Sequence, residues 1–457
     1  MAISSCSPEQ SSGKKFTPTP IPTSTPTSTV TNILALKSSS APTRPLTPTF
    51  TQTPIPLASW CPVQELAIAS SNGKLSIAYI SKKSDDNWRK DAWLWTEDAS
   101  PTRLTTWGDL DWIDVSDDGM YVAFTRQIVQ NRNVELWIIR SDGSDERLLV
   151  TSLQFAEMHK GSNAIPTDLH WVPGTHIIAF HTNPAVDEFG FVYTPDNLWW
   201  VDAESGRFSE KPVDGEVFYS PDGKRAAVVN QRYLFLMNSD GSNQRIVTLE
   251  NYHTIPVEAA YKEPPRVHWA NDSMSFYVIA PESKDIFEAL APAAWVSIWQ
   301  INFDDAQPKK VGNYNAVYTP ITFSPDHKFV TYFHPQNEFN DYGDLHLTQI
   351  GGLEDIVIYS SGVTYASWSP DSQHYIFEDS GMLYLGHICK RPLALLNEPL
   401  IGRDGVIVNG WVIWMDAYQY LLVSGDHQLY LGRIDQSEQP QKLLEDDVTT
   451  FDWVVVR

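Results

Sequence analysis

Three kinds of residue in this chain of 457 residues carry side chains that could do chemistry: loop histidines, acidic pairs and cysteines. His159 and His253 are isolated, and lone loop histidines are more often ordinary loop residues than metal ligands or general bases. Adjacent acids occur as Asp85-Asp86, Asp117-Asp118 and Asp304-Asp305. On a strand, neighbouring side chains point to opposite faces, so we interpret these pairs as turn and surface residues. The sequence therefore predicts no catalytic residue, no metal site and no cofactor.

The three cysteines are Cys6, Cys61 and Cys389, and no Cys-x-x-Cys spacing occurs. The segment that ends at Cys6 resembles the processing site of bacterial lipoproteins, although the apolar run expected before it is missing. On this hypothesis Cys6 carries a lipid, which is the only expected contact with a membrane, and the rest of the chain is extracytoplasmic. For Cys61 and Cys389 we expect two buried free thiols, with a disulfide between them as the alternative.

A threonine- and proline-rich segment follows the first 16 residues. Residues 17–58 have too few large apolar side chains to form a core, so they predict a disordered, semi-extended linker. Such tracts are often O-glycosylated stalks, and an unmodified linker is equally compatible with the composition. The organisation predicted is a lipoprotein-like terminus over residues 1–16, a linker over 17–58 and one folded region over 59–457.

Composition favours an all-β protein, because 12% of the residues are aromatic and only 19% are charged. The formal net charge is -23; residues 1–58 contribute +3, which leaves -26 on the remainder. A surface this acidic repels nucleic acid phosphates and anionic lipid headgroups, so neither is an expected partner.

One turn recurs eight times beyond Trp60. Proline sets φ at its first central position, aspartate caps it, and glycine accepts the positive φ that follows, so each copy predicts a hairpin. The clearest copies are Ser220-Pro221-Asp222-Gly223, Ser324-Pro325-Asp326-His327 and Ser369-Pro370-Asp371-Ser372. The weaker copies are Ser70-Ser71-Asn72-Gly73, Ser116-Asp117-Asp118-Gly119, Val172-Pro173-Gly174-Thr175, Ala270-Asn271-Asp272-Ser273 and Met415-Asp416-Ala417-Tyr418. An aromatic residue precedes most copies, and we expect it to wedge between neighbouring sheets.

A second signal, leucine or isoleucine followed in most cases by an aromatic residue, also occurs eight times. Its members are Leu94-Trp95, Leu136-Trp137, Leu198-Trp199, Leu234-Phe235, Ile298-Trp299, Leu345-His346, Leu383-Tyr384 and Leu429-Tyr430. Two hairpins per unit and a period near 48 residues predict a β-propeller of eight four-stranded blades. The segment Phe451-Asp452-Trp453-Val454-Val455 predicts a further strand that closes the ring on the first unit. A seven-bladed ring with one unit split between the termini is the alternative.

The residue pattern of the repeat resembles that of TolB-like propellers, which are related to WD repeats. The similarity rests on Ser220-Pro221-Asp222-Gly223, on the run Tyr121-Val122-Ala123-Phe124, and on Glu135-Leu136-Trp137 followed by Asp142-Gly143-Ser144. It covers roughly residues 60 to 457 and implies the fold more than the function. Two departures matter. The α/β domain of true TolB proteins is replaced by the linker, and the Gly-x-Ser-x-Gly elbow of the related peptidases is absent, so neither activity is expected.

The longest loops of the expected propeller lie on one face, and most of their additional residues are inserts in units 3 and 5. Long loops on a rigid scaffold are where binding usually resides, and aromatic residues mixed with acids suit a glycan or a basic peptide. The alternative is that these aromatic side chains pack their own loops onto the propeller. The candidate binding residues are Phe155, His159, Asp187, Phe189, Phe191, Tyr193, Tyr252, His253, Tyr261 and Phe287.

The first functional hypothesis is a monomeric, non-catalytic module on the cell surface that binds a protein, peptide or glycan or assists assembly. The second is a polysaccharide lyase or hydrolase with its site at the central channel, and the third is an extracytoplasmic sensor domain. Ionisable residues that converge on the channel with perturbed pKa values would favour the enzyme. An apolar plug there, with an aromatic groove in the long loops, would favour binding.

Overall fold

The computed structural model describes one folded unit. Contacts divide the chain into Met1–Pro54 and Ile55–Arg457, and every described residue belongs to the second unit. The described residues are 60–61, 73–82, 90–97, 99–128, 133–158, 164–184, 197–211, 213, 215–230, 233–249, 255–256, 262–263, 266–282, 295–315, 321–335, 343–363, 365–400, 410–425, 427–435, 439–444 and 447–456.

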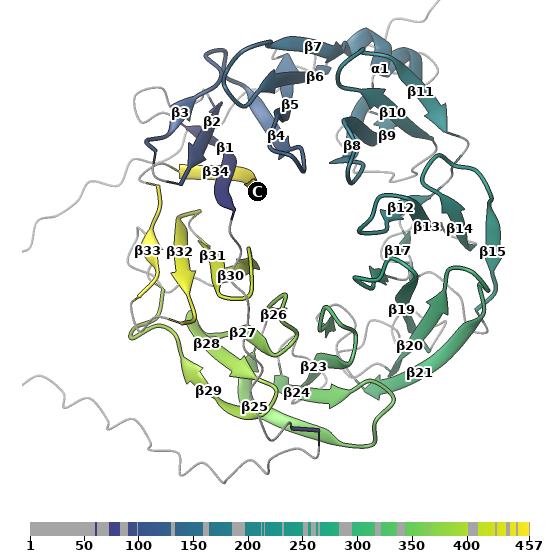
Figure 1. Ribbon diagram of the computed structural model, residues 1–457, viewed down its shortest axis with the longest axis vertical. Coiled ribbons are helices and arrows are strands. Elements are labelled where there is room, and N and C mark those ends of the chain that lie inside the picture. Colours follow the sequence, from purple (N-terminus) through teal and green to yellow (C-terminus); the bar gives the residue numbers. More distant parts are fainter. Residues whose placement is uncertain are drawn as a thin grey trace, which may run out of the picture. The chain divides into compact units, whose positions relative to one another are not determined.

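This unit is a β-propeller of eight four-stranded antiparallel blades, as predicted (Figure 1). In blades 2 to 8 the strands follow chain order from the centre outward. Each leucine-aromatic pair of the repeat lies on the third strand of its blade, as in Leu136-Trp137 of β6 and Leu383-Tyr384 of β28. The seven-bladed alternative is therefore wrong.

The strand bounds follow the repeat. Blades 1 to 4 contain β1 (Lys74–Lys82), β2 (Lys90–Thr96), β3 (Thr102–Arg103), β4 (Leu110–Val115), β5 (Tyr121–Ile128), β6 (Asn133–Arg140), β7 (Arg147–Val150), β8 (Ala164–Trp171), β9 (Ile177–Pro184), β10 (Leu198–Asp202), β11 (Phe208–Lys211), β12 (Glu216–Tyr219), β13 (Arg225–Val229), β14 (Leu234–Asn238) and β15 (Arg245–Val247). Blades 5 to 8 contain β18 (Arg266–Trp269), β19 (Ser275–Pro281), β20 (Trp295–Asn302), β21 (Pro308–Asn315), β22 (Thr322–Phe323), β23 (Phe329–Pro335), β24 (Gly343–Gln349), β25 (Asp355–Val363), β26 (Tyr365–Trp368), β27 (His374–Asp379), β28 (Met382–His387), β29 (Lys390–Ala394), β30 (Gly410–Trp414), β31 (Gln419–Ser424), β32 (Leu429–Arg433) and β33 (Gln441–Lys442).

Two connections between blades carry structure of their own. Helix α1 (Ser152–Met158) lies between blades 2 and 3, and the two-stranded ribbon of β16 (Ile255–Pro256) and β17 (Lys262–Glu263) lies between blades 4 and 5. No helix in the described part of the chain is long and apolar enough to cross a membrane.

The ring is closed by the last strand of the chain. Strand β34 (Asp447–Val456) pairs antiparallel with β1, from Lys74 opposite Val456 to Lys82 opposite Asp447, and is the innermost strand of blade 1. The prediction that Phe451 to Val455 forms a closing strand is confirmed. Blade 1 thus combines strands from both ends of the folded unit.

In blades 2 to 8 the first turn is held by its own side chains. In blade 4, the Ser220 hydroxyl donates to the Asp222 carboxylate at 2.7 Å, and that carboxylate accepts the Lys224 N–H at 3.1 Å. Gly223 follows with φ of 66°, and a Cβ there would lie 2.0 Å from the Pro173 carbonyl oxygen of blade 3. Glycine is thus required by backbone conformation and by the contact between blades.

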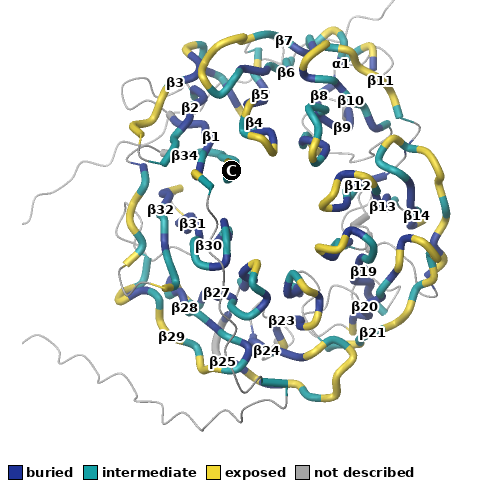
Figure 2. The backbone as a smooth tube through the Cα atoms, viewed as in Figure 1, coloured by how far each residue is buried: buried dark blue, intermediate teal, exposed yellow. Residues whose placement is uncertain are grey.

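Aromatic side chains before these turns contact the preceding blade, as the repeat predicts. The Trp269 indole N–H donates to the Phe218 carbonyl of blade 4 at 2.8 Å, and the Trp414 N–H donates to the Ser367 carbonyl of blade 7 at 3.1 Å. The buried side chains concentrate on the middle strands, and the outermost strands are more exposed (Figure 2). The core is therefore a series of hydrophobic layers between adjacent blades.

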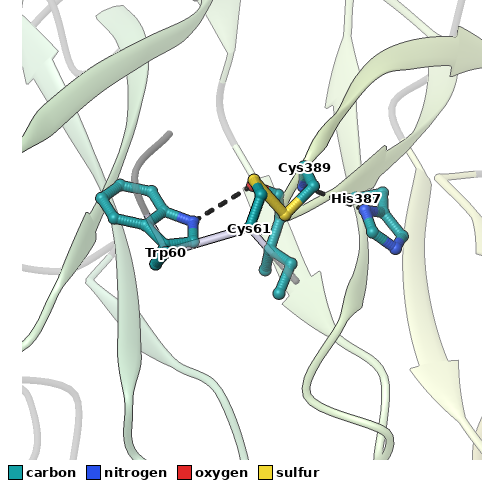
Figure 3. Close-up of a disulfide and its surroundings, with 5 residues drawn as sticks. Trp60, Cys61, His387 and Cys389 are labelled. Carbon is teal, nitrogen blue, oxygen red and sulfur yellow. Dashed lines mark hydrogen bonds between the residues drawn. A yellow bond between two sulfur atoms is a disulfide. The ribbon is translucent and has the colours of Figure 1, made fainter. Parts of the chain in front are cut away.

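A disulfide joins Cys61 to Cys389 in the hairpin between β28 and β29, with the two Cα atoms 5.5 Å apart (Figure 3). The expectation of two free thiols is wrong, because blade 7 brings Cys389 beside a segment that lies 328 positions earlier. The Trp60 indole N–H donates to the Ile388 carbonyl at 3.3 Å, and its ring lies 5.6 Å from that of Phe329 in blade 6. The segment before blade 1 is thus attached covalently to blade 7.

Candidate functional site

A cavity lies among the innermost strands β8, β12, β18 and β22, of which Figure 1 shows β8 and β12 at the inner edge of the ring. Its volume is about 590 Å³. The lining is His170, Trp171, Pro173, Val217, Phe218, Tyr219, Val267, His268, Trp269, Asn271, Phe323, Ser324, Pro325 and His327. We call it the channel cavity. No aspartate, glutamate, lysine or arginine is among these residues, although the chain carries a net charge of -23.

Strand register explains how the ionisable residues come together. Near the end of each innermost strand, one side chain packs against the preceding blade, as Trp171 and Trp269 do. The residue directly before it occupies an equivalent position in all eight blades. The eight residues at this position, from blade 1 to blade 8, are Asp452, Asp114, His170, Phe218, His268, Thr322, Ser367 and Ile413. Blades 1, 2, 3 and 5 therefore place two carboxyl groups and two imidazoles at equivalent points around the centre.

His170 presents a hydrogen-bond acceptor to this region. Its Nδ1 lies 2.7 Å from the Asp168 carbonyl oxygen, which can only accept, so Nδ1 carries the proton and Nε2 has a lone pair. Nε2 is buried and has no hydrogen-bond partner within the described part of the chain. Burial lowers the pKa of His170, which keeps the ring neutral.

His268 and His327 are also neutral imidazoles in the channel cavity. Burial lowers the pKa of each to about 4. The His268 ring lies 5.0 Å from that of Phe323, and its Nε2 is buried without a partner among the described residues. His327 occupies the turn position that holds glycine in blade 4, with φ of 51°, and its ring stacks on Tyr277 at 4.5 Å. The same turn position holds Ser273 and Ser372 at positive φ in blades 5 and 7, so His327 is a candidate functional residue through its place in the lining of the channel cavity.

Two carboxyl groups form a pair beside His170. Burial raises the pKa of Asp114 well above its usual range, and a hydrogen bond and the charge of Asp452 raise it further. Asp452 also accepts the Val115 N–H at 2.8 Å, so the pair bridges blades 1 and 2. The surrounding cavity has a volume of about 220 Å³ and is lined by Asp114, Val115, Asp117, His170, Trp171, Asp452, Trp453 and Val454. We call it the acidic cavity, and it shares His170 and Trp171 with the channel cavity.

The neutral imidazoles predict that acid destabilises the fold. His181, which is buried in β9, has its pKa lowered to about 4, as do His268 and His327. A histidine whose pKa is lower in the folded state contributes stability that is complete above about pH 6.5 and is lost as the pH falls towards 4. Each of the three should cost about 2–3 kcal/mol between pH 7 and pH 4.5.

Urea denaturation at these two pH values measures this loss, and His268→Phe provides the comparison. Phenylalanine occupies the equivalent position in blade 4, as Phe218, so the substitution suits the fold. The variant should lose less stability on acidification than the natural chain. An equal loss in both would contradict a neutral, buried His268. Asp114 acts in the opposite direction, because a carboxyl whose pKa is raised by folding destabilises the fold as the pH rises above its unfolded value.

One of the predicted binding residues lies in the described region and proves to be buried. Phe155 is on α1 with no exposed surface and packs edge-to-face on Phe180 at 5.4 Å. It packs its own segment onto the propeller and offers no surface to a ligand. The other predicted positions lie outside the described residues, namely His159, Asp187, Phe189, Phe191, Tyr193, Tyr252, His253, Tyr261 and Phe287, and so does Cys6.

Two of the acidic pairs prove to be turn residues, as predicted. Asp117 accepts the Gly174 N–H at 2.6 Å, and Asp118 accepts the Met120 N–H at 3.0 Å. Asp305 accepts the Gln307 N–H at 3.0 Å. Asp85-Asp86 lies outside the described residues. No cluster of three or more histidine, cysteine, aspartate or glutamate residues suited to a metal ion is present in the described ranges.

Comparison with known proteins identifies no family for this chain. No family model and no curated protein matches it. Similar solved structures include the Dos1 propeller, at 11% identity over 76% of this chain and 86% of that one, with a TM-score of 0.48. They also include an oligogalacturonate lyase in complex with manganese, at 13% identity over 65% and 82%, with a TM-score of 0.41. A third is TolB from Acinetobacter baumannii, at 12% identity over 71% and 80%, with a TM-score of 0.33. At these values none of the likenesses bears on function.

Proposed function

We propose that this chain is an extracytoplasmic binding module that takes up a peptide segment of a partner protein in the channel cavity. The observation that carries the proposal is the lining of that cavity. It combines aromatic surface with neutral imidazoles, two of which, His170 and His268, have a buried Nε2 without a partner among the described residues. Apolar surface with a few convergent polar groups is the usual composition of a ligand site.

A peptide suits this lining better than a glycan. Trp171, Phe218 and Phe323 give the lining aromatic surface, and none of the described lining residues is an aspartate, glutamate, lysine or arginine. Aromatic and aliphatic side chains of a peptide would bury well against such surface. An N–H group on a side chain of the same peptide would satisfy the Nε2 atom of His170 as a donor.

Two features support a position outside the cytoplasm. Disulfides such as Cys61 to Cys389 form and persist mainly in oxidising compartments. The threonine- and proline-rich linker over residues 17–58 would hold the propeller away from an anchor, which we propose is a lipid on Cys6. The acidic head would attract basic segments of envelope proteins.

The test is an array of peptides probed with the full chain, its His268→Phe variant and a His427→Asn control. His427 is an exposed histidine at positive φ in blade 8, far in sequence from the cavity, and asparagine tolerates that conformation. We expect His268→Phe to lower the affinity for the selected peptides by about tenfold or more, since a buried polar group of the peptide loses its partner. His427→Asn should leave the affinity unchanged.

A further variant, in which a loop segment is deleted, makes the outcome decisive. Residues 187–193 belong to the long-loop face that the sequence favoured as the binding surface. Binding that survives His268→Phe but disappears when these residues are deleted would place recognition on the loops and refute the channel site.

Catalysis is the second candidate, because ionisable residues with displaced pKa values do converge near the channel. Asp114, with its raised pKa, would be protonated and able to donate, and neutral His170 would be able to accept a proton. Such a pair is suited to a lyase or hydrolase acting on a polysaccharide. Mass spectrometry of oligosaccharides and array peptides after incubation tests this role: cleavage that Asp114→Asn abolishes would favour an enzyme.

A further inference from the structure

We propose that the acidic cavity binds the ammonium group of a lysine side chain, so that the peptide taken up in the channel cavity is basic. This inference rests on the proposed function and names the chemistry of its ligand. Three groups from three blades surround the site: Asp452 of blade 1, Asp114 of blade 2 and His170 of blade 3.

The acceptors around the cavity match the donors of an ammonium group. His170 offers the Nε2 lone pair, because its Nδ1 proton is donated to the Asp168 carbonyl, and Asp114 and Asp452 offer carboxyl oxygens. An ammonium group has three N–H donors and no acceptor, so it can satisfy all three side chains at once. Hydrogen bonds of this charge-assisted kind are stronger than neutral ones.

The walls of the acidic cavity suit the rest of a lysine side chain. Trp171 and Trp453 line it and provide indole surface for the aliphatic stem and for cation–π contact. A volume of about 220 Å³ is larger than a bare ion needs and holds an ammonium group with several methylene groups.

The two cavities can hold parts of one ligand. His170 and Trp171 line both, so a lysine side chain in the acidic cavity leaves its backbone at the channel cavity. Residues flanking the lysine would then lie against Phe218, His268 and Phe323. This arrangement predicts a lysine with aromatic or aliphatic neighbours.

Binding of the cation is coupled to release of a proton. Burial raises the pKa of Asp114, and the hydrogen bond and charge of Asp452 raise it further, so the site favours the protonated carboxyl. An ammonium group beside it favours the ionised form, so the proton passes to solvent as the cation enters. The other titratable groups at the cavity are Asp452, Asp117 and His170. Because a proton leaves, affinity should rise with pH up to the pKa of Asp114.

The experiment is isothermal titration calorimetry of the full chain with two capped tripeptides. One has lysine between two phenylalanines, and the other has norleucine, an uncharged residue of similar shape, in place of lysine. We expect the lysine peptide to bind about tenfold or more tightly, because the uncharged residue leaves the acceptors unsatisfied. Titration at several pH values in buffers of different ionisation enthalpy should show proton release with the lysine peptide alone.

Three variants attribute the effect to the cavity. The asparagine of Asp114→Asn resembles the protonated carboxyl, so this variant should keep the fold. It should lower the affinity for the lysine peptide and abolish proton release. Asp452→Asn should also lower the affinity for the lysine peptide. Asp111→Asn removes a carboxylate from an exposed position of the same strand, β4, and should change neither quantity. Thermal unfolding of all three confirms that each is folded before its affinity is compared.

The outcomes separate this inference from the proposed function. If both peptides bind equally and His268→Phe weakens both, the channel cavity binds peptides and the ammonium inference is wrong. If neither binds, and the array is also negative, the proposed function fails too. Displacement of the lysine peptide by millimolar glucosamine or by a divalent cation, with n-butylammonium ineffective, would overturn the inference in favour of an amino sugar or a metal ion.

Discussion

Replacing Val454 with aspartate is expected to lower the free energy of unfolding by about 3–5 kcal/mol, because it buries a charge without a partner. Val454 is 9% exposed and packs in the layer that Ala78, Ile80 and Val115 form between blades 1 and 2. It lies two residues before the end of β34 (Asp447–Val456), the strand that closes the ring against β1. A propeller without its closing strand leaves the inner edge of β1 unpaired. Urea denaturation at pH 7, followed by circular dichroism, measures the effect.

The matched control is Val456→Asp in the same strand. Val456 is 38% exposed and faces Lys74 across the ladder, so an aspartate there remains solvated and near a positive charge. Surface substitutions of this kind usually change stability by less than about 0.5 kcal/mol. Equal destabilisation by the two variants would show that burial in the closing strand does not govern stability. X-ray scattering of the Val454→Asp variant should also show a larger radius, as expected for an opened ring.

The fold could be predicted because its signals are local. The turn around Ser220-Pro221-Asp222-Gly223 fixes a hairpin through proline, aspartate and glycine, and every such requirement lies within four consecutive residues. The leucine-aromatic pairs mark the third strand in the same way. Even the closing strand is visible, because Phe451 to Val455 follows a complete eighth unit.

The candidate site could not be predicted, because its residues meet only through the ring. Asp114 and Asp452 are 338 positions apart, and no spacing in the sequence shows that they bridge neighbouring blades. One signal was nevertheless present: aligning the units on their turns places Asp114, His170 and His268 in one column.

The long loops of the sequence predicted instead that aromatic residues such as Phe155 bind a ligand. The identity of an aromatic residue does not distinguish a side chain that packs its own segment from one that meets a ligand. For Phe155 the contact with Phe180 decides the matter. The disulfide was missed for a related reason, since three cysteines without recurrent spacing give no information on pairing.

Cys389→Ser is expected to lower the free energy of unfolding by about 3–5 kcal/mol, because the disulfide closes a very long loop in the unfolded chain. Cys61 and Cys389 are separated by 328 positions, so the cross-link restricts almost the whole propeller when it unfolds. In the folded state the bond holds Trp60 against Phe329 and the Ile388 carbonyl. Urea denaturation of the variant, and of the natural chain with and without reductant, measures the contribution.

Cys6→Ser is the control, and thiol titration provides an independent measurement. The chain produced without the lipid and unfolded without reductant should expose no reactive thiol other than Cys6, whereas the reduced chain should expose all three cysteines. Cys6→Ser should leave the unfolding transition unchanged and remove the thiol that reacts without reductant. Reaction of Cys61 or Cys389 before reduction, or a transition that reductant does not shift, would mean that non-covalent contacts alone hold this segment. In that case the contact of residues 60–61 with blade 7 would depend on Trp60, whose indole N–H donates to the Ile388 carbonyl.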